Sequence, residues 1–130
     1  MNKQTFTGAI GAGGLVIQIV LGFALAGAAS ATGSLLILPH MLIGVAGIAL
    51  VAFLTSSIFL APSSMVTRLL YGLALVLTLG QVALGFRILA VPDPMLTMAH
   101  QGIAIAILVI LALASMLAAR QRRRSMTATA

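Results

Sequence analysis

The sequence predicts an all-α integral membrane protein, a four-helix bundle built from two repeated two-helix hairpins. Three observations predict this fold. Hydrophobic residues make up 62% of the chain and charged residues only 6%, too few to cover a soluble surface. Four apolar stretches are each long enough to cross a bilayer, which takes about 20 residues. Finally, the segment QIVLGF at 18–23 returns as QVALGF at 81–86, and each copy precedes an apolar stretch with one histidine.

The four predicted spans cover about 7–29, 35–60, 65–90 and 94–119. Ser34 is the expected cap of the second span, with Pro39 in its early turns. Pro62, Ser63 and Ser64 interrupt the chain before the third span. Asp93 followed by Pro94 is a typical start for the fourth helix. The spans form one membrane domain over 1–119, and residues 120–130 form a basic tail.

Basic residues indicate the orientation of the bundle. Lys3, Arg68 and the arginines within 120–124 fall at the amino terminus, near the second connection and at the carboxyl terminus, which lie on one side of a four-span protein. The positive-inside rule predicts that both termini are cytoplasmic and that connections at 30–34 and 91–93 face outward. The net charge of +6 is therefore attributed to membrane topology and attraction to anionic lipid. We expect a multi-pass protein of the cell membrane that does not bind nucleic acid.

His40 and His100 are the strongest candidate site residues. His40 follows the predicted cap Ser34 by six residues and His100 follows Asp93 by seven, so both lie about 10 Å below the outer edge at 1.5 Å per residue. Ionisable side chains at such depth usually face the bundle interior and have a partner. A lone histidine often bonds only to a carbonyl or a water. Two histidines at one depth, one per repeat, instead predict axial ligation of a haem iron.

Arg87 fits the same site from the third span. It stands three residues before the predicted end at Ala90, about 5 Å nearer the outer surface than the histidines. A guanidinium at this level can bind a haem propionate through two hydrogen bonds. The first repeat has Ala24 at the matching position, so Arg87 is not part of the repeat's packing. The alternative is that Arg87 only extends to the outer headgroups.

Small residues and glutamines surround the predicted site. Gly44 and Gly47 share a helical face with His40 and could let a macrocycle lie against the backbone. Gly22 and Gly85 occupy equivalent places in the first and third spans, although glycines at such spacings also form ordinary helix contacts. The repeated glutamines, Gln18 and Gln81, are expected to form hydrogen bonds between helices.

The repeated Q-x-x-L-G pattern, the histidine that opens the next helix, and the stretch QVALGFRILAVPDPMLTMAHQGIAIAILVILALA together resemble one four-helix half of a haem A synthase. The resemblance covers about residues 15 to 118. These enzymes oxidise a haem methyl group for terminal oxidases, and each half carries a histidine pair on its second and fourth helices. The resemblance implies that His40 and His100 bind haem b or a modified haem on the outer side of the membrane.

The chain departs from that family at one important position. The half that binds the substrate has a glutamate three residues before the first histidine, where this chain has Ile37. The cysteine pair of many members is also missing, because the chain has no cysteine. The resemblance is therefore to the half that holds haem b. It implies electron transfer or haem handling beside a respiratory terminal oxidase, within a respiratory complex or a homo-oligomer.

Two other classes of function remain open from the sequence. Met41, Met95 and Met98 flank the histidines, and thioethers together with imidazole would suit Cu(I). Methionine is also a common apolar filler of helix contacts. A structural accessory subunit of a membrane complex without any cofactor is the other alternative, although it leaves the shared depth of the histidines unexplained.

Overall fold

The computed structural model describes residues 3–27 and 30–128, and within these ranges it contains only helices and short connections. The helices are α1 (Lys3–Gly27), α2 (Ser30–Leu60), α3 (Met65–Ala90) and α4 (Pro94–Ala128). Side chains are described for 13–27, 35–121, 123–125 and 127. The predicted all-α class and the four helices are confirmed.

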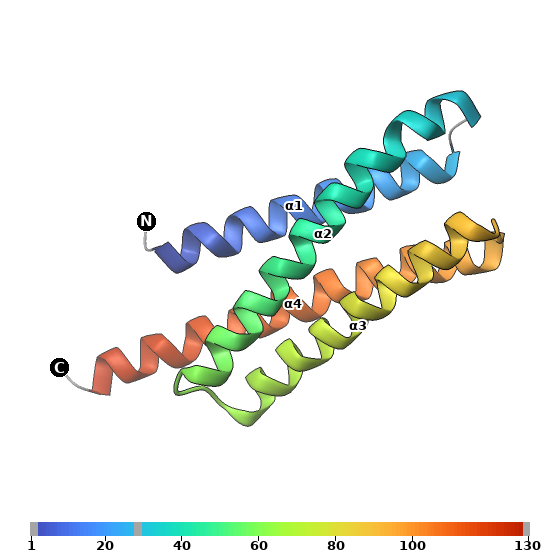
Figure 1. The fold of residues 1–130 in the computed structure, drawn as a ribbon. Helices are drawn as coiled ribbons and strands as arrows, with labels where there is room; N and C mark the ends of the chain where they lie inside the picture. Colours follow the sequence, from blue (N-terminus) through green and yellow to red (C-terminus); the bar gives the residue numbers. More distant parts are fainter. Residues whose placement is uncertain (1–2, 28–29, 129–130) are drawn as a thin grey trace.

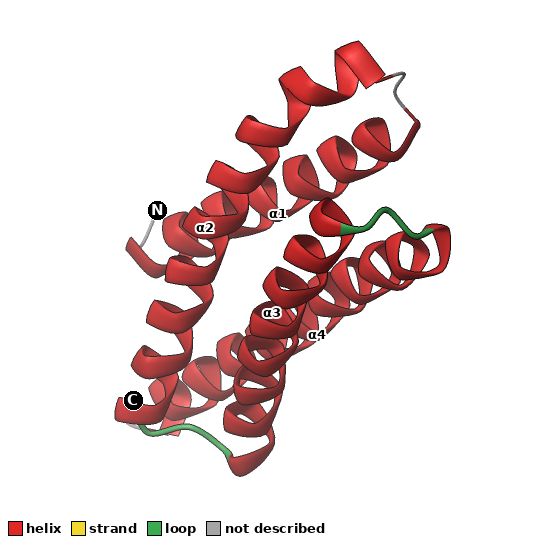
Figure 2. Ribbon diagram, turned by 45° about the vertical axis from the view of Figure 1, so that its right-hand side comes forward, coloured by secondary structure: helices red, strands yellow, loops and turns green. Residues whose placement is uncertain are grey.

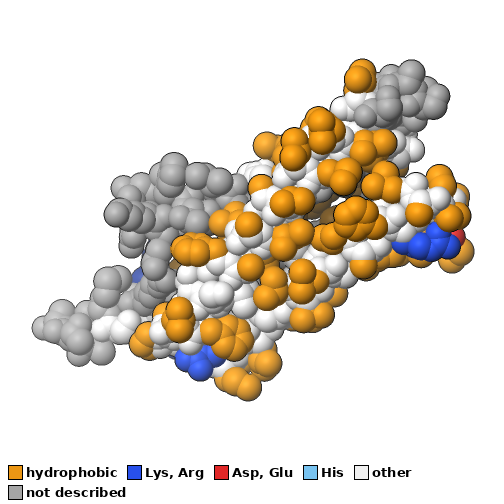
Figure 3. Space-filling model, viewed as in Figure 1, with side chains coloured by type: hydrophobic (Ala, Val, Ile, Leu, Met, Phe, Trp, Pro, Cys, Tyr) orange, Lys and Arg blue, Asp and Glu red, His pale blue; other side chains and the backbone are white. Residues whose placement is uncertain are grey.

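Three of the helices are long and apolar enough to cross a membrane: α2 over Leu35–Leu60, α3 over Met65–Ala90 and α4 over Pro94–Ser125. In α1 the apolar part with described side chains is shorter, Gly13–Gly27. Apolar side chains cover the visible face of α2 and α3 (Figure 3), as expected of helices that contact lipid. The chain is therefore a multi-pass membrane protein, and the crossing by α1 remains a prediction.

Two of the predicted helix starts are confirmed by capping bonds. Ser64 precedes α3, and its hydroxyl accepts a hydrogen bond from the backbone N–H of Thr67. Asp93 precedes α4, and its carboxylate Oδ1 accepts from the N–H groups of Met95 at 2.8 Å and Leu96 at 3.3 Å. These bonds satisfy amide groups that a helix leaves without partners in its first turn. The bounds of α3 are those predicted.

Other boundaries were predicted wrongly. The second helix begins at Ser30, so Ser34 is not its cap and 30–34 is helical instead of an outer connection. That segment holds no proline to stop a helix. The predicted end of the first span at 29 falls at 28–29, outside the described residues. The tail predicted at 120–130 does not leave the bundle as a separate segment, because α4 continues to Ala128 through arginine, glutamine and alanine, which are good helix formers.

The helices pack in a ring in which each contacts two others. α1 lies against α2 and α4, and α3 lies against the same two helices. Over the described residues the backbones of α1 and α3 are not neighbours, and neither are those of α2 and α4, which approach one another only through side chains. Figures 1 and 2 show that the α1–α2 pair separates from the α3–α4 pair toward the end of the bundle at which α1 and α3 finish. The pairs α1/α3 and α2/α4 are therefore diagonal in the bundle.

The buried residues gather at the opposite end, near the turn between α2 and α3 (residues 61–64). We call this the basic end, because Arg68, Arg120, Arg123 and Arg124 lie there, and the other the histidine end. Tyr71 is central: its hydroxyl lies 3.1 Å from that of Ser115, and its carbonyl accepts from the Thr55 hydroxyl. Among the described residues the buried set is Val51, Thr55, Ile58, Thr67, Tyr71, Ala74, Ile107 and Ala114.

Candidate functional site

The structure brings the two predicted histidines together inside the histidine end. The ring centroids of His40 and His100 are 6.2 Å apart, and the ring planes are inclined by 57°. Both residues are half-buried. His40 belongs to α2 and His100 to α4, which are diagonal in the bundle and have no backbone segments side by side. The two imidazoles therefore meet across the middle of the bundle and at one level along it, as their matching places in the repeats predicted.

A glycine of a neighbouring helix lies beside each imidazole. A Cβ atom built on Gly22 of α1 would lie 3.3 Å from Cε1 of His40, which is tighter than usual contact. One built on Gly85 of α3 would lie 3.6 Å from Cε1 of His100, an ordinary contact distance. The two glycines, equivalent in the repeat, thus border the two rings in the same way. The absence of a side chain is needed at Gly22 for the His40 ring to keep its place, whereas a small side chain at Gly85 would still fit beside His100.

The repeated glutamines bond between helices, as predicted, but they bond differently. In the first hairpin, Nε2 of Gln18 lies 3.3 Å from Nε2 of His40, a contact to the ring itself. In the second, Nε2 of Gln81 donates to the backbone carbonyl of His100 at 2.6 Å. Gln18 therefore fixes an imidazole, whereas Gln81 fixes the helix that carries one.

Four buried polar atoms at this site have no hydrogen-bond partner within the described part of the chain. They are Nδ1 of each histidine and Oε1 of each glutamine. A buried polar atom without a partner costs about 1–3 kcal/mol, so folded proteins rarely leave one. Here all four belong to the side chains around the paired imidazoles. A cluster of buried polar atoms without hydrogen-bond partners is typical of a site at which a ligand supplies the missing partners.

The other predicted site residues, Arg87, Gly44 and Gly47, do not contact the two imidazoles in the described contacts. Arg87 is exposed in the last turn of α3, and among the described residues its guanidinium forms neither a hydrogen bond nor an ion pair. A Cβ on Gly47 would meet nothing within 4 Å, so this position borders open space. A Cβ on Gly44 would lie 3.1 Å from Nε2 of Gln18. The missing side chain of Gly44 therefore makes room for a glutamine, a role that the sequence did not suggest.

The methionines near the histidines lie mainly on the outside of the bundle. Met95 is 80% exposed and Met98 71% exposed, and Met41 is also exposed. In the described residues no group of three His, Cys, Asp or Glu side chains could hold a metal ion. The polar donors of this site are therefore the two imidazoles and the two amides.

One contact of the site was missed by sequence reasoning, the contact of Gln18 with the His40 ring. A signal for it does exist in the sequence. Glutamine and glycine are spaced by four residues in both repeats, at 18 and 22 and again at 81 and 85, and residues four apart share a helical face. The same face that clears room for an imidazole thus also carries the amide that can reach it.

The site combines two facing imidazoles, two amides that fix them and two glycines that border them. Its geometry is the basis for any statement about function, since similarity supplies none. No family model, no curated protein and no solved structure matches this chain.

Proposed function

We propose that this chain is a membrane cytochrome that holds haem b, or a modified haem, between His40 and His100. The observation that carries the proposal is the pair of imidazoles 6.2 Å apart, each with a buried nitrogen that has no hydrogen-bond partner among the described residues. The proposal agrees with the resemblance to the haem-holding half of a haem A synthase.

The separation of the rings suits a shared metal ion. Metal–imidazole nitrogen bonds are about 2.0–2.1 Å long for zinc, and an iron between two imidazoles with similar bonds needs ring centres about 6 Å apart. Direct stacking of the rings would instead place aromatic centroids about 4.5–7 Å apart, so distance alone does not decide between the two arrangements. The unpartnered Nδ1 atoms favour ligation, because stacked rings in a bundle core would still need hydrogen-bond partners.

Gln18 provides the partner that a ligating histidine usually has. Such histidines donate the second ring N–H to a fixed acceptor, which sets the orientation of the ring. A half-turn of the Gln18 amide exchanges its nitrogen and oxygen, so that Oε1, otherwise without a partner, accepts from Nε2–H of His40. The other ring nitrogen of His40 then remains available to a metal.

The diagonal arrangement of α2 and α4 also suits a flat group. Facing helices of a bundle hold cofactors in its core, and these two present the imidazoles to one another while their backbones stay apart. Gly47, with open space beside it, leaves room on the same face of α2 about two turns after His40. Arg87, with no partner among the described residues, is the cation that would bind a propionate of the ring toward the outer surface.

The orientation proposed from the sequence agrees with the placement of charge. The start of α1, the turn between α2 and α3 and the end of α4 lie at one end of the bundle (Figure 1). Arg68 and the arginines of the α4 end belong to this end, so the positive-inside rule makes it cytoplasmic. The site would then lie in the outer half of the cell membrane, with both termini inside.

Haem iron bound in this way supplies one-electron chemistry by alternating between Fe(II) and Fe(III). His40 and His100 would hold the group from both sides of the bundle, and no further described side chain is placed to bind a substrate at the metal. A carboxylate for proton transfer is not at hand either, because Ile37 stands three residues before His40 and Asp93 caps α4. We therefore propose electron transfer or haem handling beside a respiratory oxidase, in a membrane complex or a homo-oligomer, and not methyl oxidation.

The absorption spectrum of the purified protein tests this function. We expect a sharp Soret band that shifts on reduction with dithionite, together with split α and β bands in the reduced state. Mass spectrometry of the extracted pigment identifies the ring. A colourless protein that does not take up added haem contradicts the proposal and leaves the accessory subunit, whereas copper bound in equal amount would indicate the Cu(I) alternative.

A further inference from the structure

A groove of about 390 Å³ runs along the outside of the bundle at the basic end, far from the histidines. Its walls come from the end of α2 and the start of α3, and all but one of them are apolar or glycine. The lining residues are Phe59, Met65, Arg68, Leu69, Gly72 and Leu73. Figure 3 shows a basic side chain surrounded by apolar ones at the turn between these helices. One cation thus stands at the head of an apolar groove.

Arg68 is a half-buried cation that no carboxylate neutralises. Its Nε donates to the Ser63 hydroxyl at 3.1 Å, and its Nη2 donates to the carbonyl of Ala61 at 3.3 Å. A guanidinium has five N–H donors, so these two bonds leave three for another acceptor. The single acidic side chain of the sequence, Asp93, caps α4 at the opposite end. The free donors of Arg68 therefore suit an anion from outside the chain.

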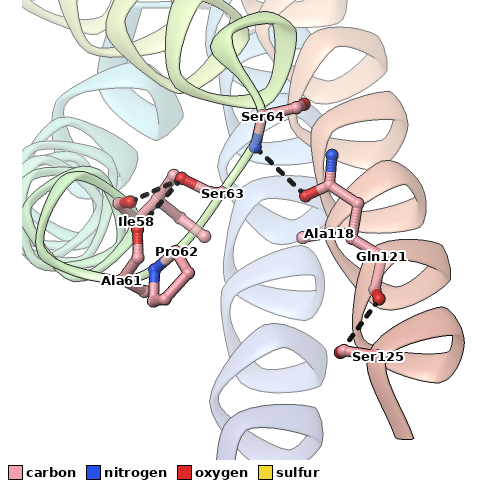
Figure 4. A pocket seen from close by; sticks show the side chains of 8 residues that line it. All are labelled: Ile58, Ala61, Pro62, Ser63, Ser64, Ala118, Gln121 and Ser125. Atoms are coloured by element: carbon pink, nitrogen blue, oxygen red, sulfur yellow. Dashed lines mark hydrogen bonds between the residues drawn. The ribbon is translucent and has the colours of Figure 1, made fainter. Parts of the chain in front are cut away.

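The turn holds Arg68 in a defined place. Ser63, which accepts from Arg68, itself donates to the carbonyl of Ile58 at 2.8 Å. The N–H of Ser64 donates to Oε1 of Gln121, so the turn is also tied to α4 (Figure 4). A side chain that merely extends to water would keep its rotamer freedom. Arg68 is instead oriented before any ligand arrives, which lowers the entropic cost of binding.

Gly72 gives the groove its depth. It follows Arg68 by four residues and so lies on the same face of α3. A Cβ at this position would meet nothing within 4 Å, and the neighbouring Phe59, Leu69 and Leu73 are 53%, 58% and 46% exposed. The missing side chain leaves an apolar channel along the helix below the guanidinium. A hydrocarbon chain parallel to α3 would fit it.

We propose that the groove binds one anionic glycerophospholipid, with its phosphate on Arg68 and one acyl chain along Gly72. The free donors of a guanidinium match the geometry of a phosphate group. The membrane supplies the apolar chain in the same molecule, which a free phosphate ion lacks. The exposed arginines Arg120, Arg123 and Arg124 do not line the groove. This site is independent of the proposed haem.

Fluorescence quenching by brominated lipid tests the site. The chain has no tryptophan, so Phe59→Trp places a single reporter in the groove wall. The protein is reconstituted in phosphatidylcholine with increasing brominated phosphatidylglycerol. We expect the reporter to prefer phosphatidylglycerol by about fivefold, the factor for one basic residue near a membrane surface. Phe23→Trp, similarly exposed near the histidine end of α1 and without a basic residue beside it in the sequence, should show no preference.

Two further pairs of variants separate a site from diffuse attraction. Arg68→Gln should abolish the preference at the Phe59→Trp reporter, whereas Arg123→Gln, which removes the same charge nearby, should preserve it. Gly72→Leu should fill the groove and lower the preference without removing charge, and Gly80→Leu, another open glycine of α3, should not. Equal effects of Arg68→Gln and Arg123→Gln, or no preference in the parent reporter, would overturn the proposal.

Discussion

The two ends of this bundle differ in what holds them together. At the basic end, α2, α3 and α4 share buried apolar side chains and a hydroxyl bond between Tyr71 and Ser115. At the histidine end no described side chain is buried to that degree, and the close contacts are those of His40, His100 and the two glutamines. The basic end is closely packed, whereas the histidine end contains polar atoms that lack hydrogen-bond partners among the described residues.

We interpret the basic end as the part that stabilises the bundle and the histidine end as the part that carries the proposed function. Membrane helices associate through close van der Waals packing and hydrogen bonds, since lipid is as apolar as their side chains. The basic end provides that packing and needs no ligand to complete it. The histidine end leaves four buried polar atoms without hydrogen-bond partners among the described residues, and the ligand that we propose would complete it. Functional sites are commonly less stable than the rest of the protein for this reason.

Replacing either histidine should cause the largest change. His40→Ala and His100→Ala should each abolish the bands of low-spin haem, because one axial ligand is lost, while helix content stays the same because the packed end is untouched. Absorption spectra before and after reduction, with circular dichroism, measure both. The control is Met41→Ala, beside His40 and exposed. Unchanged spectra in both histidine variants would show that the ligands are assigned wrongly.

Ile107→Ala should lower the stability of the bundle without changing the proposed haem site, the opposite of what we expect for the histidine variants. Ile107 is 3% exposed, and truncation of a buried isoleucine costs about 2–5 kcal/mol in well-packed cores. We expect a loss near 2 kcal/mol in unfolding by sodium dodecyl sulfate, with haem bands at unchanged wavelengths. Val109→Ala, at an exposed site of the same helix, should change little. A haem spectrum that shifts with Ile107 would mean that the two ends are coupled.

Variants of the two glutamines should distinguish the contact of Gln18 with the His40 ring from the contact of Gln81 with the backbone of α4. Gln18→Leu should weaken haem binding by about tenfold or more, the usual effect of losing the partner of a ligating histidine. Gln81→Leu should have the smaller effect, because Gln81 bonds to the backbone of His100. Titration of the haem-free protein with haem measures both affinities. Equal losses would contradict the different roles that the structure gives them.

Arg87→Ala should leave the haem bound but change its potential. A nearby positive charge disfavours Fe(III), so its removal stabilises Fe(III) and lowers the reduction potential. At roughly 12 Å and an effective dielectric constant of about 20 the interaction is about 1.4 kcal/mol, on the order of 60 mV for one electron. Redox titration followed by absorption measures the shift. A potential that does not move would indicate that Arg87 only contacts headgroups.

The smallest effect should come from the paired glycines. Gly22→Ala introduces a Cβ 3.3 Å from the His40 ring and must displace it slightly, whereas Gly85→Ala makes an ordinary 3.6 Å contact with His100. The electron paramagnetic resonance of oxidised haem is sensitive to the orientation of its axial rings. We therefore expect a changed signal for Gly22→Ala and the parent signal for Gly85→Ala. The reverse order would contradict the distances.

The sequence was sufficient for features that depend on local chemistry. Apolar stretches identified the helices, Pro62, Ser63 and Ser64 marked the break before α3, and Asp93 marked the start of α4 through the cap that it forms. It failed at the start of α2, because Ser34 has the chemistry of a cap but the preceding residues continue the helix to Ser30. A capping residue permits a helix to start and does not require it.

The histidines show the same division most clearly. Their matching positions in a repeat, read from the sequence, were enough to predict one depth and one shared ligand. Only the tertiary structure decided that α2 and α4 are diagonal, that the rings lie 6.2 Å apart and that Gln18 reaches a ring while Gln81 reaches a backbone. Hydropathy and caps act over a few residues of one helix. The rotation and spacing of helices depend on contacts between residues far apart in the chain, which no single segment encodes.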